Sequence, residues 1–215
     1  MQPLALFDLD FTMLDGDSEF MWSRFLFDQK LVGQDFMDGI SAFYRDYDAG
    51  CLDIYVYQSF LLGPLTLLSV TQREHLLADY MDRVRLVVRP EMLAVAQRHR
   101  DDGYEMLLIS ATNHFLVEPT ARLLGFNNII CTNAKRDGEA YTTMLEGIPA
   151  FREGKVRRLE QWLAENGLTL EGSWGYSDSF NDLPLLELVT HPVAVKPDAR
   201  LEQHARQRGW MILDF

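Results

Sequence analysis

"LALFDLDFTML", residues 4–14, opens with a short apolar run that leads directly into two aspartates. The apolar run has the length and composition of a buried β-strand. Asp8 and Asp10 follow it, and Thr12 comes two places later. Two carboxylates so close together at the end of a buried strand repel one another unless a positive charge lies between them. The stretch therefore predicts a buried strand whose end carries a cation.

From residue 90 onward the chain alternates between helix-like and strand-like segments. We expect helices where apolar residues recur at three- and four-residue spacing, and strands at the short apolar runs between them. The expected helices cover 90–103, 114–125 and 151–167, and the expected strands cover 104–110, 127–133, 172–177, 191–195 and 210–215. This alternation predicts an α/β fold in which a parallel sheet carries helices on both faces.

The segment between the first strand and residue 89 has a different pattern. Its aromatic and aliphatic residues recur at helical spacing, and no strand-like run interrupts them. We therefore expect a core domain of residues 1–14 and 89–215 and an all-helical domain of residues 15–88 inserted after the first strand. Ligands of α/β sheets bind at the carboxyl edge of the strands, so the apolar patches of the insertion are expected to cover that edge.

One part of the insertion has nearly the length of a membrane span. Residues 54–72 contain no charged side chain. Polar residues interrupt the stretch, and Gly63-Pro64 would break a single helix in its middle. We predict two short buried helices with a turn at Gly63-Pro64 rather than a membrane helix.

Composition narrows the class of partner and the compartment. The chain has 20 basic and 32 acidic residues, a formal net charge of −12, which argues against nucleic acid or an anionic membrane as the partner. Cys51 and Cys131 lie 80 residues apart without a CxxC spacing, which favours a reduced, cytoplasmic protein. The N-terminal residues show no signal-peptide pattern.

Polar side chains follow several of the expected strands at the point where each strand ends. Taken alone, each is explained as a turn or helix-cap residue. The carboxyl ends of parallel strands meet at one edge, however, so the whole set is expected to converge on one crevice. The set comprises Asp8, Asp10, Thr12, Ser110, Asp178, Asn181 and Asp182, together with Lys155 at the start of a helix.

Such a set fits phosphoryl transfer. Carboxylate oxygens of Asp8 and Asp178 suit Mg²⁺, which would be the cation between the opening carboxylates. A carboxylate can serve as the nucleophile and form an aspartyl-phosphate, and a second Asp two residues later returns to the same face of an extended chain and could act as the general acid and base. The hydroxyls of Thr12 and Ser110 and the ammonium of Lys155 would bind the phosphate oxygens.

Four motifs in this order resemble those of the haloacid dehalogenase (HAD) superfamily: "DLDFT", "LLISAT", "GKVRRL" and "YSDSFNDL", spanning residues 8 to 182. The helical insertion between the first two motifs resembles a type C1 cap. The continuation "DGDSEFMWSRF" resembles the subfamily IB phosphatases, relatives of phosphoserine phosphatase. The resemblance implies a Rossmann-like parallel sheet under a helical cap, and a Mg²⁺-dependent phosphatase that hydrolyses a small-molecule phosphomonoester through an aspartyl-phosphate.

The resemblance also implies roles for individual residues. Asp8 would be the nucleophile and a metal ligand, and Asp10 the general acid–base that also offers its backbone carbonyl to Mg²⁺. Thr12, Ser110 and Lys155 would bind phosphate, Asp178 would bind the metal, and Asn181 and Asp182 would support the metal site. An Asp at position 10 is typical of phosphatases and phosphomutases rather than dehalogenases.

The insertion departs from a phosphoserine enzyme in its charges. No Lys or Arg occurs from Asp46 to Gln72. In a phosphoserine enzyme the cap supplies an Arg that binds the substrate carboxylate, and the corresponding position falls near Leu61 in this sequence. Phosphoserine is therefore a disfavoured substrate unless Arg45 or Arg73 reaches in, because a buried unpaired carboxylate is costly.

The acidic and aromatic residues of the insertion favour another kind of substrate. Asp17 falls where phosphoserine phosphatase has a Glu that contacts the substrate amine, and Glu19 follows it as a second acidic candidate for substrate specificity. This lining favours an amine-bearing or partly apolar phosphomonoester, of which histidinol phosphate is one example. Phe11 stands where the family has a small residue and is expected to narrow the entrance or reposition the loop.

Two other functions remain open at this point. A phosphotransferase or phosphomutase would use the same intermediate but pass the phosphoryl group to an alcohol. A non-catalytic phospholigand-binding protein on the same fold would have lost Asp8, Asp10, Lys155 or Asp178, and all four are present. Closure of the insertion over the crevice is expected, with hinges near residues 15–16 and 88–90.

Overall fold

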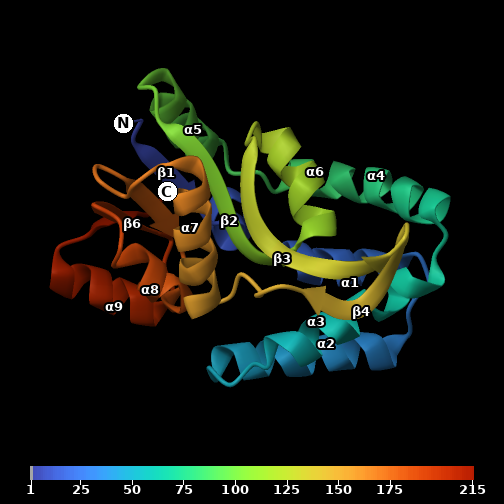
Figure 1. The fold of residues 1–215 in the computed structure, drawn as a ribbon. Coiled ribbons are helices and arrows are strands. Elements are labelled where there is room, and N and C mark those ends of the chain that lie inside the picture. The colour runs from blue at the N-terminus through green and yellow to red at the C-terminus, as the bar shows by residue number, and fades with distance from the viewer. Residues whose placement is uncertain (1) are drawn as a thin grey trace.

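The computed structural model describes residues 2–215 and shows a seven-stranded sheet with helices around it (Figure 1). The strand order is β4-β3-β2-β1-β5-β6-β7, so the first strand lies at the centre of the sheet. The strands are β1 (Leu4–Phe7), β2 (Glu105–Asn113), β3 (Asn128–Asp137), β4 (Ala140–Glu146), β5 (Trp174–Ser177), β6 (His191–Val195) and β7 (Met211–Leu213). The predicted α/β fold with a Rossmann-like sheet is confirmed.

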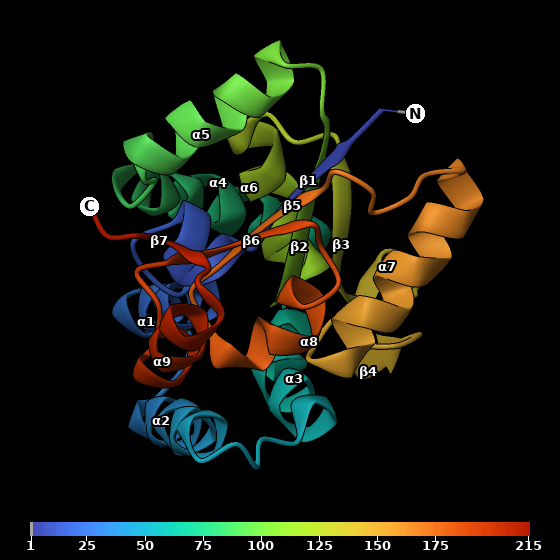
Figure 2. The ribbon, with the colours of Figure 1, turned by 90° about the vertical axis from the view of Figure 1, so that its left-hand side faces the viewer.

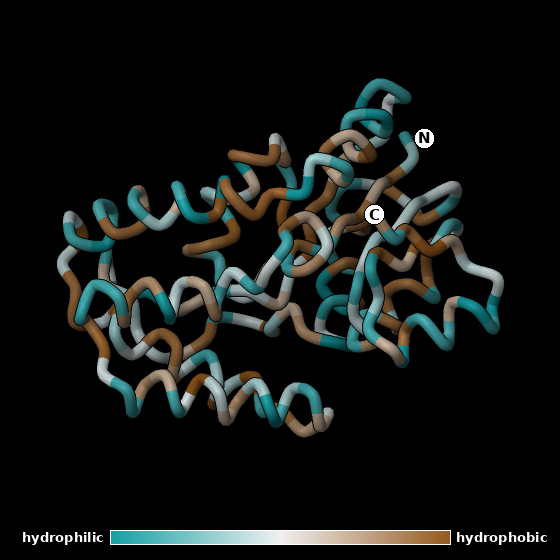
Figure 3. The backbone as a smooth tube through the Cα atoms, turned by 180° about the vertical axis from the view of Figure 1, so that it is seen from behind, coloured by the Kyte–Doolittle hydropathy of each residue, from teal (hydrophilic) through white to brown (hydrophobic). Residues whose placement is uncertain are grey.

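Helices cover both faces of the sheet, because alternate residues of β1 point to opposite sides (Figure 2). Ala5 and Phe7 pack into the cluster that includes α5 and α6, whereas Leu4 and Leu6 pack against α7 and α8. Figure 3 shows apolar stretches along the strands and hydrophilic residues on the outer helices. The helices after the insertion are α5 (Pro90–Asp101), α6 (His114–Leu124), α7 (Glu153–Asn166), α8 (Leu183–Leu186) and α9 (Ala199–Arg208).

Residues between β1 and α5 form the expected all-helical insertion. It comprises α1 (Ser18–Asp28), α2 (Gln34–Asp48), α3 (Ile54–Leu62), a 3₁₀ turn at Gly63–Leu67 and α4 (Val70–Leu86). The division of the chain into two domains stays a prediction.

The two connections between core and insertion lie side by side. Leu14 and Val88 form an antiparallel bridge, and the Asp15 amide donates to the Val87 carbonyl at 2.6 Å. Arg89 is buried and its guanidinium donates to the Leu14 carbonyl at 3.2 Å and to Asp15 Oδ1 at 2.6 Å. The predicted hinge segments are therefore paired with one another and joined by a buried cation.

The uncharged stretch at 54–72 breaks where the sequence predicts. α3 ends at Leu62 and the 3₁₀ turn begins at Gly63, so the second predicted helix is a 3₁₀ turn rather than an α-helix. Within residues 2–215 no single helix is long and apolar enough to cross a membrane. Residues 54–67 and 70–86 pass that test of length and composition only as a pair, bent by 116°.

Three elements after residue 90 were not predicted, β4, α8 and α9. β4 pairs antiparallel with β3, so the expectation of a wholly parallel sheet was wrong at this edge. Asp137-Gly138 is a hairpin signal, and Gly138 adopts a φ of 59° in the two-residue turn between the strands. The hairpin reaches the insertion, where Arg73 Nη2 donates to the Glu139 carbonyl at 2.6 Å.

Candidate active site

Asp8 lies directly after β1 and its side chain is 9% exposed. The Asp8 amide donates to the Tyr176 carbonyl on β5 at 2.9 Å, which fixes the end of the central strand. Residues Leu9–Met13 then form a tight turn, closed by the Leu14 amide on the Leu9 carbonyl at 3.0 Å. Asp8 and Asp10 both line one cavity, but this turn brings them together rather than the alternation of an extended chain that the sequence argument assumed.

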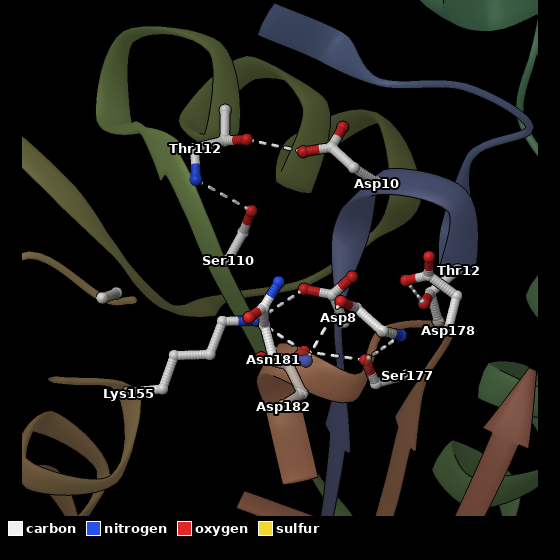
Figure 4. A network of polar contacts seen from close by, with 12 residues as sticks. Asp8, Asp10, Thr12, Ser110, Thr112, Lys155, Ser177, Asp178, Asn181 and Asp182 are labelled. Atoms are coloured by element: carbon white, nitrogen blue, oxygen red, sulfur yellow. Dashed lines mark hydrogen bonds and ion pairs between the residues drawn. The ribbon is translucent and has the colours of Figure 1, made fainter. Parts of the chain in front are cut away.

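Lys155, near the start of α7, joins carboxylates from the two ends of the chain (Figure 4). Its Nζ donates to Asp8 Oδ1 and to Asp182 Oδ2, each at 2.7 Å, and all three side chains are buried. Ser177, at the end of β5, donates its hydroxyl to Asp182 Oδ2 at 2.7 Å. This ammonium compensates Asp8, one of the two opening carboxylates, whereas Asp10 accepts from the Ser18 amide and the Thr112 hydroxyl.

Burial and charge act in opposite directions on the pKa values of this pair. Burial raises the pKa of Asp8 to about 7, although the Lys155 ammonium lowers it. Burial by itself would lower the pKa of Lys155, but the carboxylates of Asp182 and Asp8 raise it above its usual range. Lys155 therefore stays protonated and can hold a dianionic phosphate as well as a carboxylate.

Asp10 is held by two donors. Its Oδ1 accepts from the Ser18 amide at 2.7 Å, and its Oδ2 accepts from the Thr112 hydroxyl at 2.5 Å. Burial and the neighbouring Asp17 raise its pKa to about 7, which suits a group that gives and takes a proton near neutral pH. Ser110 accepts the Thr112 amide on its Oγ at 3.1 Å and lines the cavity.

Asp178 follows β5 and lines the cavity across from β1. Its Oδ1 accepts the Thr12 hydroxyl at 3.2 Å. Thr12 is fully buried and lies outside the cavity lining, so the structure places its hydroxyl on Asp178 rather than in the space for a phosphate. Burial, and then repulsion from Asp8 and Asp182, raise the pKa of Asp178 well above its usual range.

The oxygen atoms near the mutually repelling carboxylates of Asp8 and Asp178 fit a magnesium ion. Within residues 2–215 no group of three or more His, Cys, Asp and Glu side chains is placed to hold a metal. The available set is the carboxylates of Asp8 and Asp178 with the backbone carbonyl of Asp10, all oxygen donors, and Mg²⁺ usually keeps several waters beside one or two carboxylates. Three carboxylates, those of Asp8, Asp178 and Asp182, face a single ammonium there, so a divalent cation would relieve the excess of negative charge.

Above these residues lies a cavity of about 350 Å³ between the sheet edge and the insertion. Eight carboxylates line it, and among residues 2–215 Lys155 is the one cationic side chain that does so. Six aromatic side chains complete the lining: Phe11, Phe43, Tyr44, Tyr47, Tyr57 and Phe151. The cavity is thus acidic and aromatic beyond the phosphate end.

Asp17 and Glu19 come from the start of α1 and face this cavity. Glu19 Oε1 accepts from the Asn113 amide at 2.9 Å and from Gln58 Nε2 at 2.8 Å. Burial and the charge of Asp17 raise the pKa of Glu19 to about 8. Burial also raises the pKa of Asp17, against a hydrogen bond from Tyr44 that lowers it. Both groups would be stabilised as carboxylates by a ligand cation.

No cation from the insertion enters the cavity within the described part of the chain. Leu61, where the clamp position falls, is fully buried in the core. Arg73 donates to the Leu68 and Glu139 carbonyls, and neither it nor the exposed Arg45 belongs to the cavity lining. Arg45 and Arg73 therefore do not supply a cation that could bind a substrate carboxylate in this cavity.

Several residues that hold the others in place were not predicted from the sequence. Thr112 orients Asp10, and its one signal was its place in "LLISAT" after the strand. Arg152, which was not predicted, donates its Nε to Asn181 at 3.0 Å, and Asn181 is a predicted site residue that lines the cavity. Tyr47 of α2 hydrogen-bonds Ser179 at 3.0 Å between the two hydroxyl oxygens. These contacts join segments far apart in the sequence, so local sequence patterns do not predict them.

Comparisons with known proteins agree with this geometry. A family model described as haloacid dehalogenase-like hydrolase matches residues 5–187. A histidinol-phosphatase of Neisseria meningitidis is 41% identical over 221 residues that cover 100% of both chains. A phosphoserine phosphatase of Mycobacterium tuberculosis is 40% identical over 121 residues, which cover 56% of this chain and 39% of that protein.

Solved structures show the same fold. A protein of unknown function from Bordetella pertussis Tohama I superposes with a TM-score of 0.93 at 37% identity, covering 100% of this chain and 99% of the other. A substrate-bound phosphoserine phosphatase superposes with a TM-score of 0.74 at 15% identity, covering 100% of this chain and 94% of the other. At that identity the second likeness is one of fold.

Proposed function

The chain belongs to the haloacid dehalogenase-like hydrolases and is a phosphatase, and from this premise we propose that it hydrolyses a small-molecule phosphomonoester through an aspartyl-phosphate on Asp8, with Mg²⁺ as cofactor. The observation that carries the proposal is the buried Lys155 ammonium, 2.7 Å from both Asp8 and Asp182, at the closed end of an acidic cavity. Asp10 and Asp178 line the same end of that cavity.

In the first step the Asp8 carboxylate attacks phosphorus and the ester oxygen leaves. Asp10 gives its proton to that oxygen, a role for which a pKa of about 7 is suited. Lys155 and the Ser110 hydroxyl bind the phosphoryl oxygens as their charge develops. In the second step Asp10 takes a proton from water, the water oxygen attacks phosphorus, and inorganic phosphate leaves Asp8.

Residues of the core and the start of the insertion support this chemistry. Thr112 and the Ser18 amide hold the Asp10 carboxyl, so the proton donor depends on the start of the insertion being in place. Asp8, Asp178 and the Asp10 carbonyl would hold Mg²⁺, which would screen the repulsion between a carboxylate nucleophile and a phosphate dianion. Asp182 and Asn181 hold Lys155 and Arg152, respectively.

For the substrate we propose an amine-bearing phosphomonoester with an apolar or aromatic body. The Neisseria relative is a histidinol-phosphatase, and histidinol phosphate has an ammonium group and an imidazole ring. Asp17 and Glu19 would bind the ammonium, while the aromatic lining would contact the ring. Phosphoserine stays disfavoured, because its carboxylate would meet an acidic wall whose lining contains no Arg within residues 2–215.

A phosphotransferase would share every step up to the aspartyl-phosphate. An alcohol acceptor in place of water would give a new ester instead of inorganic phosphate. A binding protein without catalysis would keep the phosphate end but need no proton donor at Asp10, and this chain orients that carboxyl with two hydrogen bonds. Hydrolysis is the function that these contacts support best.

Phosphate release from a panel of phosphomonoesters tests the proposal. We expect Mg²⁺-dependent release by the wild type, highest with histidinol phosphate, and a loss of at least about 10³-fold in kcat for Asp8→Asn, as for other enzymes that lose a nucleophile. Asp35→Asn on the outer face of α2 makes the same chemical change at an exposed carboxylate and should keep full activity.

Three results would contradict parts of the proposal. Retained turnover by Asp8→Asn would exclude Asp8 as the nucleophile. Transfer to an added alcohol without phosphate release would favour the phosphotransferase. A higher kcat/KM for phosphoserine than for histidinol phosphate would reverse the substrate preference.

A further inference from the structure

Phe11 has an unusual backbone conformation for an aromatic residue. Its φ of 54° and ψ of −6° lie in the left-handed region, where the Cβ atom of an L-residue is crowded by its own backbone. The Phe11 amide donates to the Gly16 carbonyl at 3.1 Å, so the turn holds this conformation. Glycine and asparagine adopt such a conformation at much lower cost, so Phe is a poor choice for the turn itself.

The Phe11 ring does not offset the strain energy by packing in the hydrophobic core. It is 46% exposed and belongs to none of the buried hydrophobic clusters. Other non-glycine residues with positive φ in the described chain are Lys30, Arg152 and Lys196, which are long cationic side chains. Lys30 and Lys196 are exposed at surface turns, whereas Phe11 combines strain with an apolar ring that lines the cavity.

The Phe11 ring lies close in the chain to residues of the phosphate end. Phe11 lies between Asp10, which hands a proton to the departing ester oxygen, and Thr12, which contacts Asp178. Phe11 and Asp10 line the same cavity, so the body that a substrate carries on that oxygen can lie beside residue 11. Tyr47 and Phe151, with ring centroids 6.1 Å apart, also line the cavity.

We propose that Phe11 is a specificity-determining residue, whose ring contacts the aromatic ring of the substrate's leaving group. The proposal rests on the phosphatase function above and extends it. Strain retained at a cavity wall, without a gain in folding, indicates a residue kept for its ligand.

Two variants and two substrates test the contact. Phe11→Asn removes the ring and suits a left-handed turn, and Phe11→Tyr keeps both the ring and the strain. Histidinol phosphate carries an ammonium and a ring, whereas ethanolamine phosphate carries the ammonium alone. We expect Phe11→Asn to lower kcat/KM for histidinol phosphate about tenfold, mainly through KM, which corresponds to one aromatic contact. Its kcat/KM for ethanolamine phosphate should stay unchanged.

Stability gives an independent readout with the opposite sign. Relief of the strain should raise the Tm of Phe11→Asn by about 2–4 °C, while Phe11→Tyr should keep the wild-type Tm and the wild-type preference between the two substrates. An equal loss for both substrates would overturn the proposal, because a ring that only excludes water or positions Asp10 acts on every ester. A fall in Tm for Phe11→Asn would show that the ring serves folding.

Failure of the phosphatase function can be told apart from failure of this proposal. If the wild type releases no phosphate from either ester, calorimetric Kd values for the two esters still report the contact in the Asp8→Asn background. There, adding Phe11→Asn should weaken the binding of histidinol phosphate alone. Equal effects on the two esters in that measurement would overturn the role of Phe11 as well.

Discussion

Individual residues around the cavity are governed by buried charge. Asp8 and Asp182 are compensated by the Lys155 ammonium. Asp17 and Glu19, on the insertion side, repel one another and accept from hydrogen-bond donors, and within residues 2–215 Lys155 is the one cationic side chain that lines their cavity. The pKa of Glu19 is consequently raised from 4.5 to about 8, chiefly by burial. An unfolded chain loses the Glu19 proton first as the pH rises above 4.5, so the cost of this group to stability grows from that pH to about 8 and stays at its full value above it.

Glu19→Gln should therefore stabilise the protein in a pH-dependent way. The free energy of unfolding of the variant minus that of the wild type should grow by on the order of a few kcal/mol between pH 5 and pH 9 and then level off. Urea unfolding at these two values measures it. Glu160→Gln, an exposed site on α7, should give a difference that does not change with pH. A constant difference for Glu19→Gln would contradict the raised pKa.

The residues that carry charge were recognisable in the sequence, and the residues that orient them were not. Asp8, Lys155, Asp178 and Asp182 each stand at a strand end or near a helix start, and the structure brings all four to one cavity. Ser110, expected at a strand end, lines the same cavity from within β2. The hydrogen bonds that orient Asp10 depend on where a turn and an insertion fold back onto the strand. The spacing of residues in the sequence does not predict how the turn and the insertion fold back.

Among the elements, the start of α7 is the most constrained by local geometry. A Cβ atom at Gly154 would lie 2.1 Å from the Pro149 carbonyl oxygen, which is far below a normal contact. Lys155 is the next residue, and its amide donates to the Arg152 carbonyl at 2.9 Å. The close approach of this turn to the helix therefore sets where the Lys155 ammonium lies relative to Asp8.

Gly154→Ala should consequently impair activity more than stability. A methyl group must push the first turn of α7 outward, and a displacement of about 1 Å at a catalytic group can cost about 10²-fold in rate. kcat for phosphate release and Tm together measure it. Gly33→Ala is the matched control, because a Cβ there meets nothing within 4 Å. Full activity in Gly154→Ala would show that the turn adjusts without moving Lys155.

Regular elements were predictable to the extent that they bury a periodic face. The expected strands and helices after residue 90 appear in the expected order, because each has an apolar run or stripe that a sheet or helix must bury. β4 escaped because its residues are mostly exposed, and it pairs through its backbone with β3. α9 is mostly polar and packs through Leu201 and Ala205, which is too narrow a stripe to stand out.

On the scale of the whole molecule, the insertion is tied to the core at more places than its two connections. Glu19 bonds the Asn113 amide, Arg73 bonds the Glu139 carbonyl, and Tyr47 bonds Ser179. The first two ties hold α1 and the start of α4, whereas Tyr47 lies near the end of α2. Movement that admits substrate is expected to break the single Tyr47–Ser179 contact, which would free the end of α2 and the loop before α3.

Cys51 lies in that loop and offers a probe of the movement. It is exposed, whereas Cys131 is buried and burial raises its thiol pKa to about 12, so a thiol reagent should modify one cysteine rapidly and the second after unfolding. Mg²⁺ with beryllium fluoride, a phosphoryl mimic, should slow the reaction of Cys51 severalfold. Cys51→Ser identifies the fast phase, and Asp8→Asn should abolish the protection. An unchanged rate would locate the movement elsewhere.

Leu14 and Val88 pair with one another where the chain leaves the sheet edge and returns to it. Asp8, Lys155, Asp178 and Asp182 all lie outside the segment that these two residues bracket, whereas Asp17, Glu19 and the tyrosines of the cavity lie within it. A segment with adjacent ends can be exchanged for another of different length at small entropic cost. The segment between Leu14 and Val88 can therefore be replaced while the phosphate end of the cavity is kept. Evolution, or an engineer who grafts a different helical segment between these residues, can redirect the same phosphate chemistry to new substrates.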